Sequence, residues 1–131
     1  MKNISEEKGA IPPEYGKENS TLICILSEKK RYAKSYNKYL QKNMGKEYTG
    51  EIVYITDAES KTEKYADLDK YRYLFFRDHY QSPTSEYMTS KFYIIDRKLD
   101  KTYKCKMTSG AFGKLILGYA IQLEKKRNSW K

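Results

Sequence analysis

The sequence is short of the residues that usually carry metal binding and nucleophilic catalysis. It has 131 residues, with two cysteines and a single histidine, His79. Cys24 and Cys105 lie far apart and match no zinc-binding spacing, and a lone histidine has no second imidazole to share a metal with. We therefore expect no metal, no cofactor and no catalytic residues. Both cysteines are expected to be free core thiols, with a disulfide as the alternative.

Long apolar runs are also missing. No stretch reaches 18 apolar residues, so the sequence predicts no transmembrane helix. The first 20 residues lack the apolar segment of a signal peptide. We therefore expect a cytoplasmic protein or, if a signal segment has been removed, an extracytoplasmic one in the periplasm or at the cell surface.

A glycine-containing phosphate loop is absent as well. The segment TSGAFGKL at 108–115 has only two residues between Gly110 and Gly113, and Leu115 follows Lys114. A P-loop needs four residues between its glycines and a Ser or Thr after the lysine. We interpret this segment as the capped start of a helix.

What the sequence has in excess is tyrosine and positive charge. It contains 14 tyrosines and a net charge of +9. Three lysines and four glutamates give the first 20 residues a charge of −1, so the remainder carries +10. Such a charge favours an anionic partner without choosing among nucleic acid, acidic lipid and polyanionic glycan, although solvated lysine-rich faces are the simpler explanation.

Hydrophobic periodicity predicts five strands and two long helices. The strands are expected at 20–26, 49–56, 70–77, 92–95 and 102–107, and the helices at 29–44 and 109–127, with Gly45 ending the first helix. Residues 57–69 are polar enough for a loop or one short helix, and 81–90 for a loop. Residues 1–19 are expected to form a flexible or extended arm, followed by a single domain at 20–131.

These elements predict an α+β fold with the order β-α-β-β-β-β-α. The first β-α-β unit is expected to be a parallel crossover and the later strands an antiparallel meander, which gives one mixed five-stranded sheet with 20–26 as its central strand. Both long helices are expected on one face. The other face would then be poorly covered, unless the arm or a partner lies on it.

The first helix has a cationic side. Lysines and one arginine recur along it at 30, 31, 34, 38 and 42, and no acid lies between Lys29 and Lys46. Like charges four residues apart mildly destabilise a helix. Sequence drift in a lysine-rich chain explains the pattern most simply, and an anion-binding surface is the alternative.

Aromatic and basic residues alternate in the predicted sheet, where single-stranded nucleic acid could stack its bases and pair its phosphates. The RNA-recognition signature is absent, so we hold this hypothesis second. His79 follows Asp78 at the end of the third predicted strand, and without a placed nucleophile we interpret it as a loop residue. The candidate binding residues are Tyr71, Arg72, Tyr73, Arg77, Tyr93, Lys104 and Lys106.

Three stretches carry a family resemblance: IPPEYGKENSTLICIL at 11–26, YADLDKYRYLFF at 65–76 and YIIDRKLDKTYKCKM at 93–107. They resemble small uncharacterised exported proteins, often lipoproteins, of Bacteroides-type bacteria. Those proteins have a P-x-x-(F/Y)-G entry segment, a basic tyrosine-rich helix, a KYRY strand, a D-R-K-x-x-K-T-Y hairpin and a closing helix. The resemblance spans about residues 11–127. It implies an envelope location and an N-terminal tether of about 18 residues, and it supplies no catalytic residues.

Two functional hypotheses follow. The first is a non-enzymatic binding or structural domain of the bacterial cell envelope, with an anionic or envelope partner. The alternative is a cytosolic domain that binds single-stranded nucleic acid through a basic aromatic sheet face. An enzyme that uses His79 with Asp78 is a third and less favoured interpretation, because no partner residues for acid–base chemistry can be placed.

Overall fold

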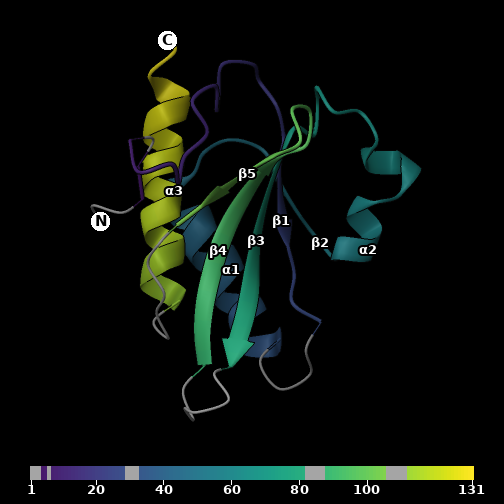
Figure 1. Cartoon of the computed structure of the whole chain (residues 1–131), viewed down its shortest axis with the longest axis vertical. Coiled ribbons are helices and arrows are strands. Elements are labelled where there is room, and N and C mark those ends of the chain that lie inside the picture. Colours follow the sequence, from purple (N-terminus) through teal and green to yellow (C-terminus); the bar gives the residue numbers. More distant parts are fainter. Residues whose placement is uncertain (1–3, 6, 29–32, 82–87, 106–111) are drawn as a thin grey trace.

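The computed structural model describes residues 4, 5, 7–28, 33–81, 88–105 and 112–131, and residues 33, 78–81, 88–91 and 112 of these by their backbone alone. It confirms an α+β fold with one mixed five-stranded sheet and two long helices (Figure 1). The elements in chain order are β1 (Leu22–Ile25), α1 (Ala33–Glu47), β2 (Ile52–Ile55), α2 (Asp57–Ser60), the 3-10 helix η1 (Glu63–Tyr65), β3 (Tyr73–Gln81), β4 (Met88–Asp96), β5 (Lys101–Lys104) and α3 (Phe112–Asn128).

The sheet has the strand order β2-β1-β3-β4-β5. β1 is parallel to both β2 and β3, whereas β3, β4 and β5 pair antiparallel in succession. The predicted parallel crossover and antiparallel meander are therefore confirmed. The central strand is β3 and not β1, because β3 inserts beside β1 and carries the meander on its other side.

Successive side chains of each strand point to opposite faces of the sheet. In β1, Leu22 and Cys24 belong to one hydrophobic cluster while Ile23 belongs to a second. In β3, Tyr73 and Phe75 belong to the first cluster, and Leu74 belongs to the second. The sheet thus has two apolar faces, which we call the helix face and the second face.

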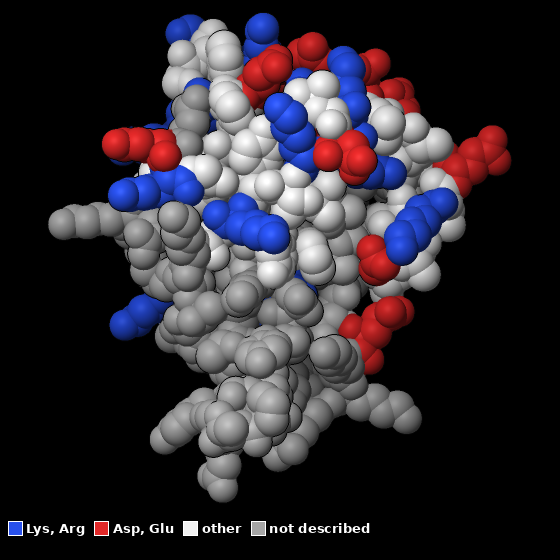
Figure 2. All heavy atoms as spheres, viewed as in Figure 1, with Lys and Arg blue, Asp and Glu red and all other residues white. Residues whose placement is uncertain are grey.

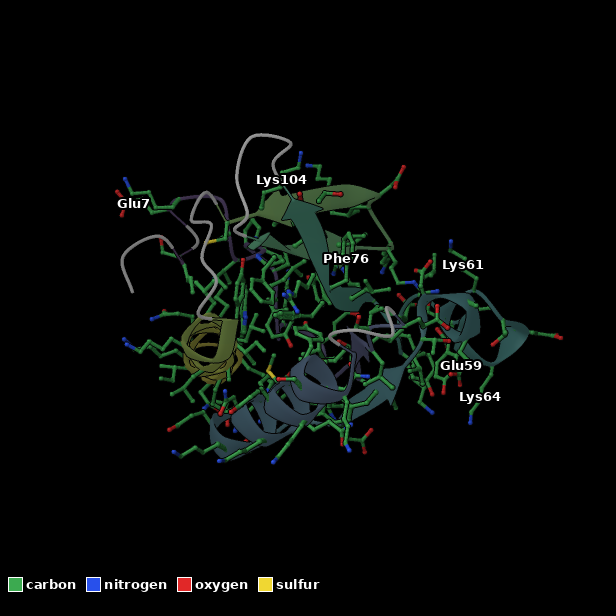
Figure 3. All side chains as sticks on the ribbon, turned by 90° about the horizontal axis from the view of Figure 1, so that it is seen from below. Glu7, Glu59, Lys61, Lys64, Phe76 and Lys104 are labelled. Atoms are coloured by element: carbon green, nitrogen blue, oxygen red, sulfur yellow. The ribbon has the colours of Figure 1, made fainter. Side chains whose placement is uncertain are left out.

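The helix face is covered by α1 and α3, which pack against each other (Figure 3). Their apolar stripes are fully buried together with residues of β3 and β4. The rings of Phe75, Phe92 and Tyr119 meet here, with centroids 5.0 to 5.9 Å apart. The expectation that both long helices lie on one face is confirmed. The main buried helix residues are Tyr36, Leu40, Met44, Leu115, Ile116, Tyr119, Ala120 and Leu123.

The N-terminal residues differ from the expected arm at 1–19. Ile4, Ala10, Ile11 and Tyr15 are buried within the cluster of the helix face. The Tyr15 hydroxyl lies 2.7 Å from the Tyr48 hydroxyl. The backbone carbonyl of Tyr15 accepts a hydrogen bond from the Trp130 indole N–H. A free arm would leave these side chains in water, so this lead-in segment (4, 5 and 7–19) is part of the folded domain.

Gly16 allows the lead-in segment to lie close to α3. Its φ is +82°, a left-handed conformation that favours glycine, and a Cβ placed there would lie 2.5 Å from the Arg127 Cα. This close approach explains why a residue without a side chain lies where the lead-in segment contacts α3.

Several element boundaries also differ from the prediction. α1 continues through Gly45 to Glu47, because Met44 is fully buried beside it and packing outweighs a local stop signal. β3 extends to Gln81, so Asp78 and His79 lie within a strand and pair with Lys91 and Ser90. β4 starts at Met88, inside the predicted loop 81–90. The predicted helix start at 29–32 and the segment 106–111 lie outside the described residues.

Candidate ligand-binding surface

The second face is covered over β1, β2 and part of β3 by the segment that contains α2 and η1. Tyr65 of η1 and Tyr71 pack there with strand residues, and the two rings form an edge contact at 5.0 Å. The polar segment 57–69, which the sequence predicts as a loop or one short helix, therefore covers part of the second face. The strand residues beneath it are Ile23, Ile25, Ile55 and Leu74.

Two local devices hold α2 over the sheet. The Thr56 hydroxyl accepts a hydrogen bond from the backbone N–H of Glu59, whose carboxylate reaches back to Thr56, which is a capping box. The Arg97 guanidinium, at the end of β4, donates to the carbonyl of Tyr71 at 2.8 Å and to that of Ser60 at 3.3 Å. Arg97 thereby ties the covering segment to the antiparallel half of the sheet.

The second face remains open over β4 and β5. Phe76, Tyr93 and Lys104 are cross-strand neighbours in the sheet register and form one row, which we call the aromatic row. The Phe76 and Tyr93 rings are stacked at 5.0 Å, and the Lys104 ammonium lies 5.8 Å from the centroid of Tyr93. Both rings are half-buried and Lys104 is exposed. Phe76 and Lys104 are labelled in Figure 3.

A hollow of about 220 Å³ lies between the aromatic row and α2. Leu74, Phe76 and Ile95 form its apolar floor, while Asp57, Ser60, Lys61 and Arg97 supply polar groups at its edge. We call it the α2 hollow. Figure 2, in which α1 lies behind the sheet, shows uncharged surface between scattered basic and acidic side chains. Such a site can take an apolar group. An anion attached to that group would compete for Lys61 with the Asp57 carboxylate, which lies 3.1 Å from the Lys61 ammonium.

Three of the predicted binding residues are buried by the chain itself. Tyr71, Arg72 and Tyr73 are 9%, 5% and 2% exposed. Arg72 makes two hydrogen bonds to the Asp96 carboxylate, at 3.0 and 2.8 Å. These bonds raise the pKa of Arg72. Burial alone would raise the pKa of Asp96, but the bonds from Arg72 and from two backbone N–H groups lower it. The structure thus gives Arg72 a structural partner.

The other predicted residues divide between the two faces. Arg77 lies on the helix face, with its guanidinium 4.5 Å from the centroid of Tyr36, and burial lowers the pKa of Arg77 to about 10. Tyr93 and Lys104 lie together in the aromatic row, and Lys106 lies outside the described residues. The structure therefore brings together two of the seven, Tyr93 and Lys104, on open surface.

Sequence reasoning missed Phe76, Ile95 and Lys61 as surface partners of Tyr93 and Lys104. A signal for Phe76 and Ile95 was present in the strand alternation, since both share a face with Leu74. No local pattern places Lys61, because its position depends on α2 folding back over the sheet.

Other reactive groups do not assemble into a site within the described residues. No group of three or more His, Cys, Asp or Glu side chains comes together in this part of the chain. Cys24 and Cys105 are buried thiols that form no disulfide, which confirms the preferred interpretation, and burial raises the pKa of the Cys24 thiol. None of the helices in the described ranges has the length and hydrophobicity to span a bilayer.

Comparison with known proteins gives remote structural neighbours. No protein-family model matches the chain, and no curated protein matches it. Two solved structures of PelC dodecamers from Paraburkholderia phytofirmans are similar to it. A point variant in space group C2 has 11% identity over 83% of this chain and 90% of that chain, with a TM-score of 0.46. The form in space group P6 has 12% identity over 88% and 91%, with a TM-score of 0.47. Similarity at this level does not extend to function.

Proposed function

We propose that this chain is a non-catalytic binding domain whose ligand lies on the open half of the second face. The observation that carries the proposal is the α2 hollow, whose apolar floor of Leu74, Phe76 and Ile95 adjoins the aromatic row. Apolar surface set among polar groups in a concave place is the usual form of a small binding site.

The neighbours of the Tyr93 ring limit which class of ligand can bind there. Phe76 is stacked on one face of its ring, and Lys104, on the strand at the other side, approaches the ring as a cation. A nucleobase needs a free ring face for stacking. This geometry therefore supports single-stranded nucleic acid less well than a ligand with an apolar part in the hollow and an anionic group near Lys61 or Lys104.

A fluorescent probe with this chemistry tests the proposal. 8-Anilinonaphthalene-1-sulfonate combines apolar rings with one anionic group, and we expect it to bind the native protein saturably. Lys61→Glu adds a negative charge at the edge of the hollow and should weaken binding severalfold. Lys64→Glu is the matched control, because Lys64 is exposed on η1 and does not line the hollow. Equal affinities for the two variants would contradict the proposed site.

We also propose that the domain works in the cell envelope. The support is the sequence resemblance to exported Bacteroides-type proteins, which the comparisons neither extend nor replace. Antibodies against the chain, applied to fractions of the native cells, should detect it in the envelope fraction. The N-terminus of the mature protein should be one left by removal of a signal segment. Recovery only from the cytoplasm would contradict this proposal and leave the ligand-binding proposal standing.

A further inference from the structure

The outer side of α1 carries a continuous row of lysines. Lys34, Lys38, Lys42 and Lys46 are all exposed and occur at every fourth position. At 3.6 residues per turn, each lysine is rotated by about 40° from the last, so the four span an arc of about 120°. The buried residues Tyr36, Leu40 and Met44 have the same spacing and lie on the opposite side of the helix. We call this row the lysine ladder.

The helix itself supplies little negative charge to offset the ladder. The first turn of α1 has no acidic residue, and Glu47 is the only acid in the helix. None of the ion pairs in the described ranges includes any of the four lysines. Like charges at this spacing repel one another and oppose helix formation. An anionic surface outside the domain would relieve that repulsion.

We propose that the lysine ladder binds the anionic surface of a lipid bilayer. Figure 3 shows one side of α1 turned away from the sheet. Because the four lysines lie opposite the buried side of α1, a plane can approach all of them at once. The lysines near the limits of the arc start farther from that plane, and their flexible four-carbon stems can span the difference. Lysines close to an anionic leaflet each contribute to attraction, which falls off within a Debye length.

A bilayer fits the ladder better than single-stranded nucleic acid does. Proteins that bind single strands place aromatic rings beside their cations so that bases can stack. The exposed residues among the lysines are Ser35, Gln41 and Gly45, which offer no ring. Tyr39, 42% exposed, lies toward the edge of the arc. In the described part of α1, the ladder thus has four cations and a single exposed ring, Tyr39, at its edge, and not the series of rings on which successive bases stack.

The ladder and the proposed ligand site lie on opposite sides of the sheet. α1 packs on the helix face, whereas the aromatic row and the α2 hollow belong to the second face. A domain held on a bilayer through the ladder would therefore present its binding site away from the membrane. The two proposals are independent, since neither surface contributes residues to the other.

Vesicle co-sedimentation tests the proposal with a matched pair of variants. The ladder variant K34Q/K38Q/K42Q/K46Q and the control variant K8Q/K64Q/K70Q/K101Q lose the same four charges from exposed positions. Glutamine and lysine have similar helix propensity, so the fold should persist, which circular dichroism checks. The native chain should sediment with phosphatidylcholine vesicles that contain phosphatidylglycerol at low salt, and should be released at high salt.

We expect the ladder variant to lose about fivefold in partitioning for each lysine removed, and the control variant to lose far less. Equal losses would show that net charge alone matters and would overturn the proposal. Binding to pure phosphatidylcholine would overturn it as well. So would a result in which the ladder is needed for a single-stranded oligonucleotide but not for vesicles.

Discussion

The two faces of the sheet are both apolar, yet they are covered in different ways. On the helix face, α1, α3 and the lead-in segment bury the apolar residues of β1, β3 and β4 almost completely, while Ile52, Tyr54 and Tyr103 on the two edge strands stay half-buried. On the second face, α2 and η1 cover β1 and β2, and leave Phe76, Tyr93 and Ile95 half-buried. The helix face holds most of the buried core, and the open half of the second face combines half-buried apolar residues with the α2 hollow.

The largest effect should come from two adjacent residues that face opposite ways. Phe75 is 1% exposed and contacts the Phe92 and Tyr119 rings, whereas Phe76 is half-buried in the aromatic row. Phe75→Ala should lower the free energy of unfolding by about 3–5 kcal/mol, the usual cost of a cavity of this size. Phe76→Ala should cost about 1–2 kcal/mol. Urea unfolding measures both, and equal losses would abolish the distinction between the faces.

The next effect concerns the ion pair between Arg72 and Asp96. Asp96→Asn removes the close counterion of the buried Arg72 and leaves only the Glu14 carboxylate, 3.9 Å away. This change should cost about 3 kcal/mol at pH 7. The native pKa of Asp96 is lowered, so its stabilisation is complete above the unfolded value of about 3.9 and is lost as the pH falls through the native pKa.

The pH dependence of this variant is the sharper measurement. The difference in unfolding free energy between the native chain and D96N should shrink on acidification below about pH 4. Asp100→Asn, at an exposed position, is the control and should behave like the native chain. A difference that stays constant down to pH 2 would rule out a lowered pKa for Asp96.

A smaller effect tests how firmly the lead-in segment covers the helix face. Gly16→Ala introduces strain at a positive φ and a clash with Arg127, and should cost about 1–3 kcal/mol. Gly9 also has a positive φ but has open space around its Cβ position, so Gly9→Ala should cost less. Thermal unfolding compares the two. If both variants were equally stable, the lead-in segment would not be docked on α3 as the structure shows.

The strand patterns predicted much of this fold because alternation and helical spacing are local. The apolar run at 22–25 and the alternating residues of β3 identified a sheet with two apolar faces. The lead-in segment was missed because its four buried residues are scattered among charged ones and have no regular period. Its burial depends on contacts with Tyr48 and Trp130, which are far away in the sequence.

The candidate site was predicted less well than the fold. Arg72 has the sequence surroundings of a surface cation, but its partner Asp96 comes 24 residues later. Tyrosine adds to the difficulty because its ring suits both a core and a surface. The alternation predicted for 70–77 gives no sign that Tyr71 precedes the strand and packs on the second face while Tyr73 packs on the helix face. The Tyr65 ring of η1 and the Tyr15 ring of the lead-in segment, which contact them, lie far from any local pattern.

The central claim is that ligands contact the open half of the second face and not the helix face. Ile94 and Ile95 are neighbours in β4 that belong to opposite faces, so their methyl groups report on the two faces separately. NMR spectra of the methyl-labelled isoleucines, recorded while 8-anilinonaphthalene-1-sulfonate is added, should show the Ile95 signal moving in a saturable way while the Ile94 signal stays in place. Movement of Ile94 without Ile95, or of neither at saturating probe, would contradict the account.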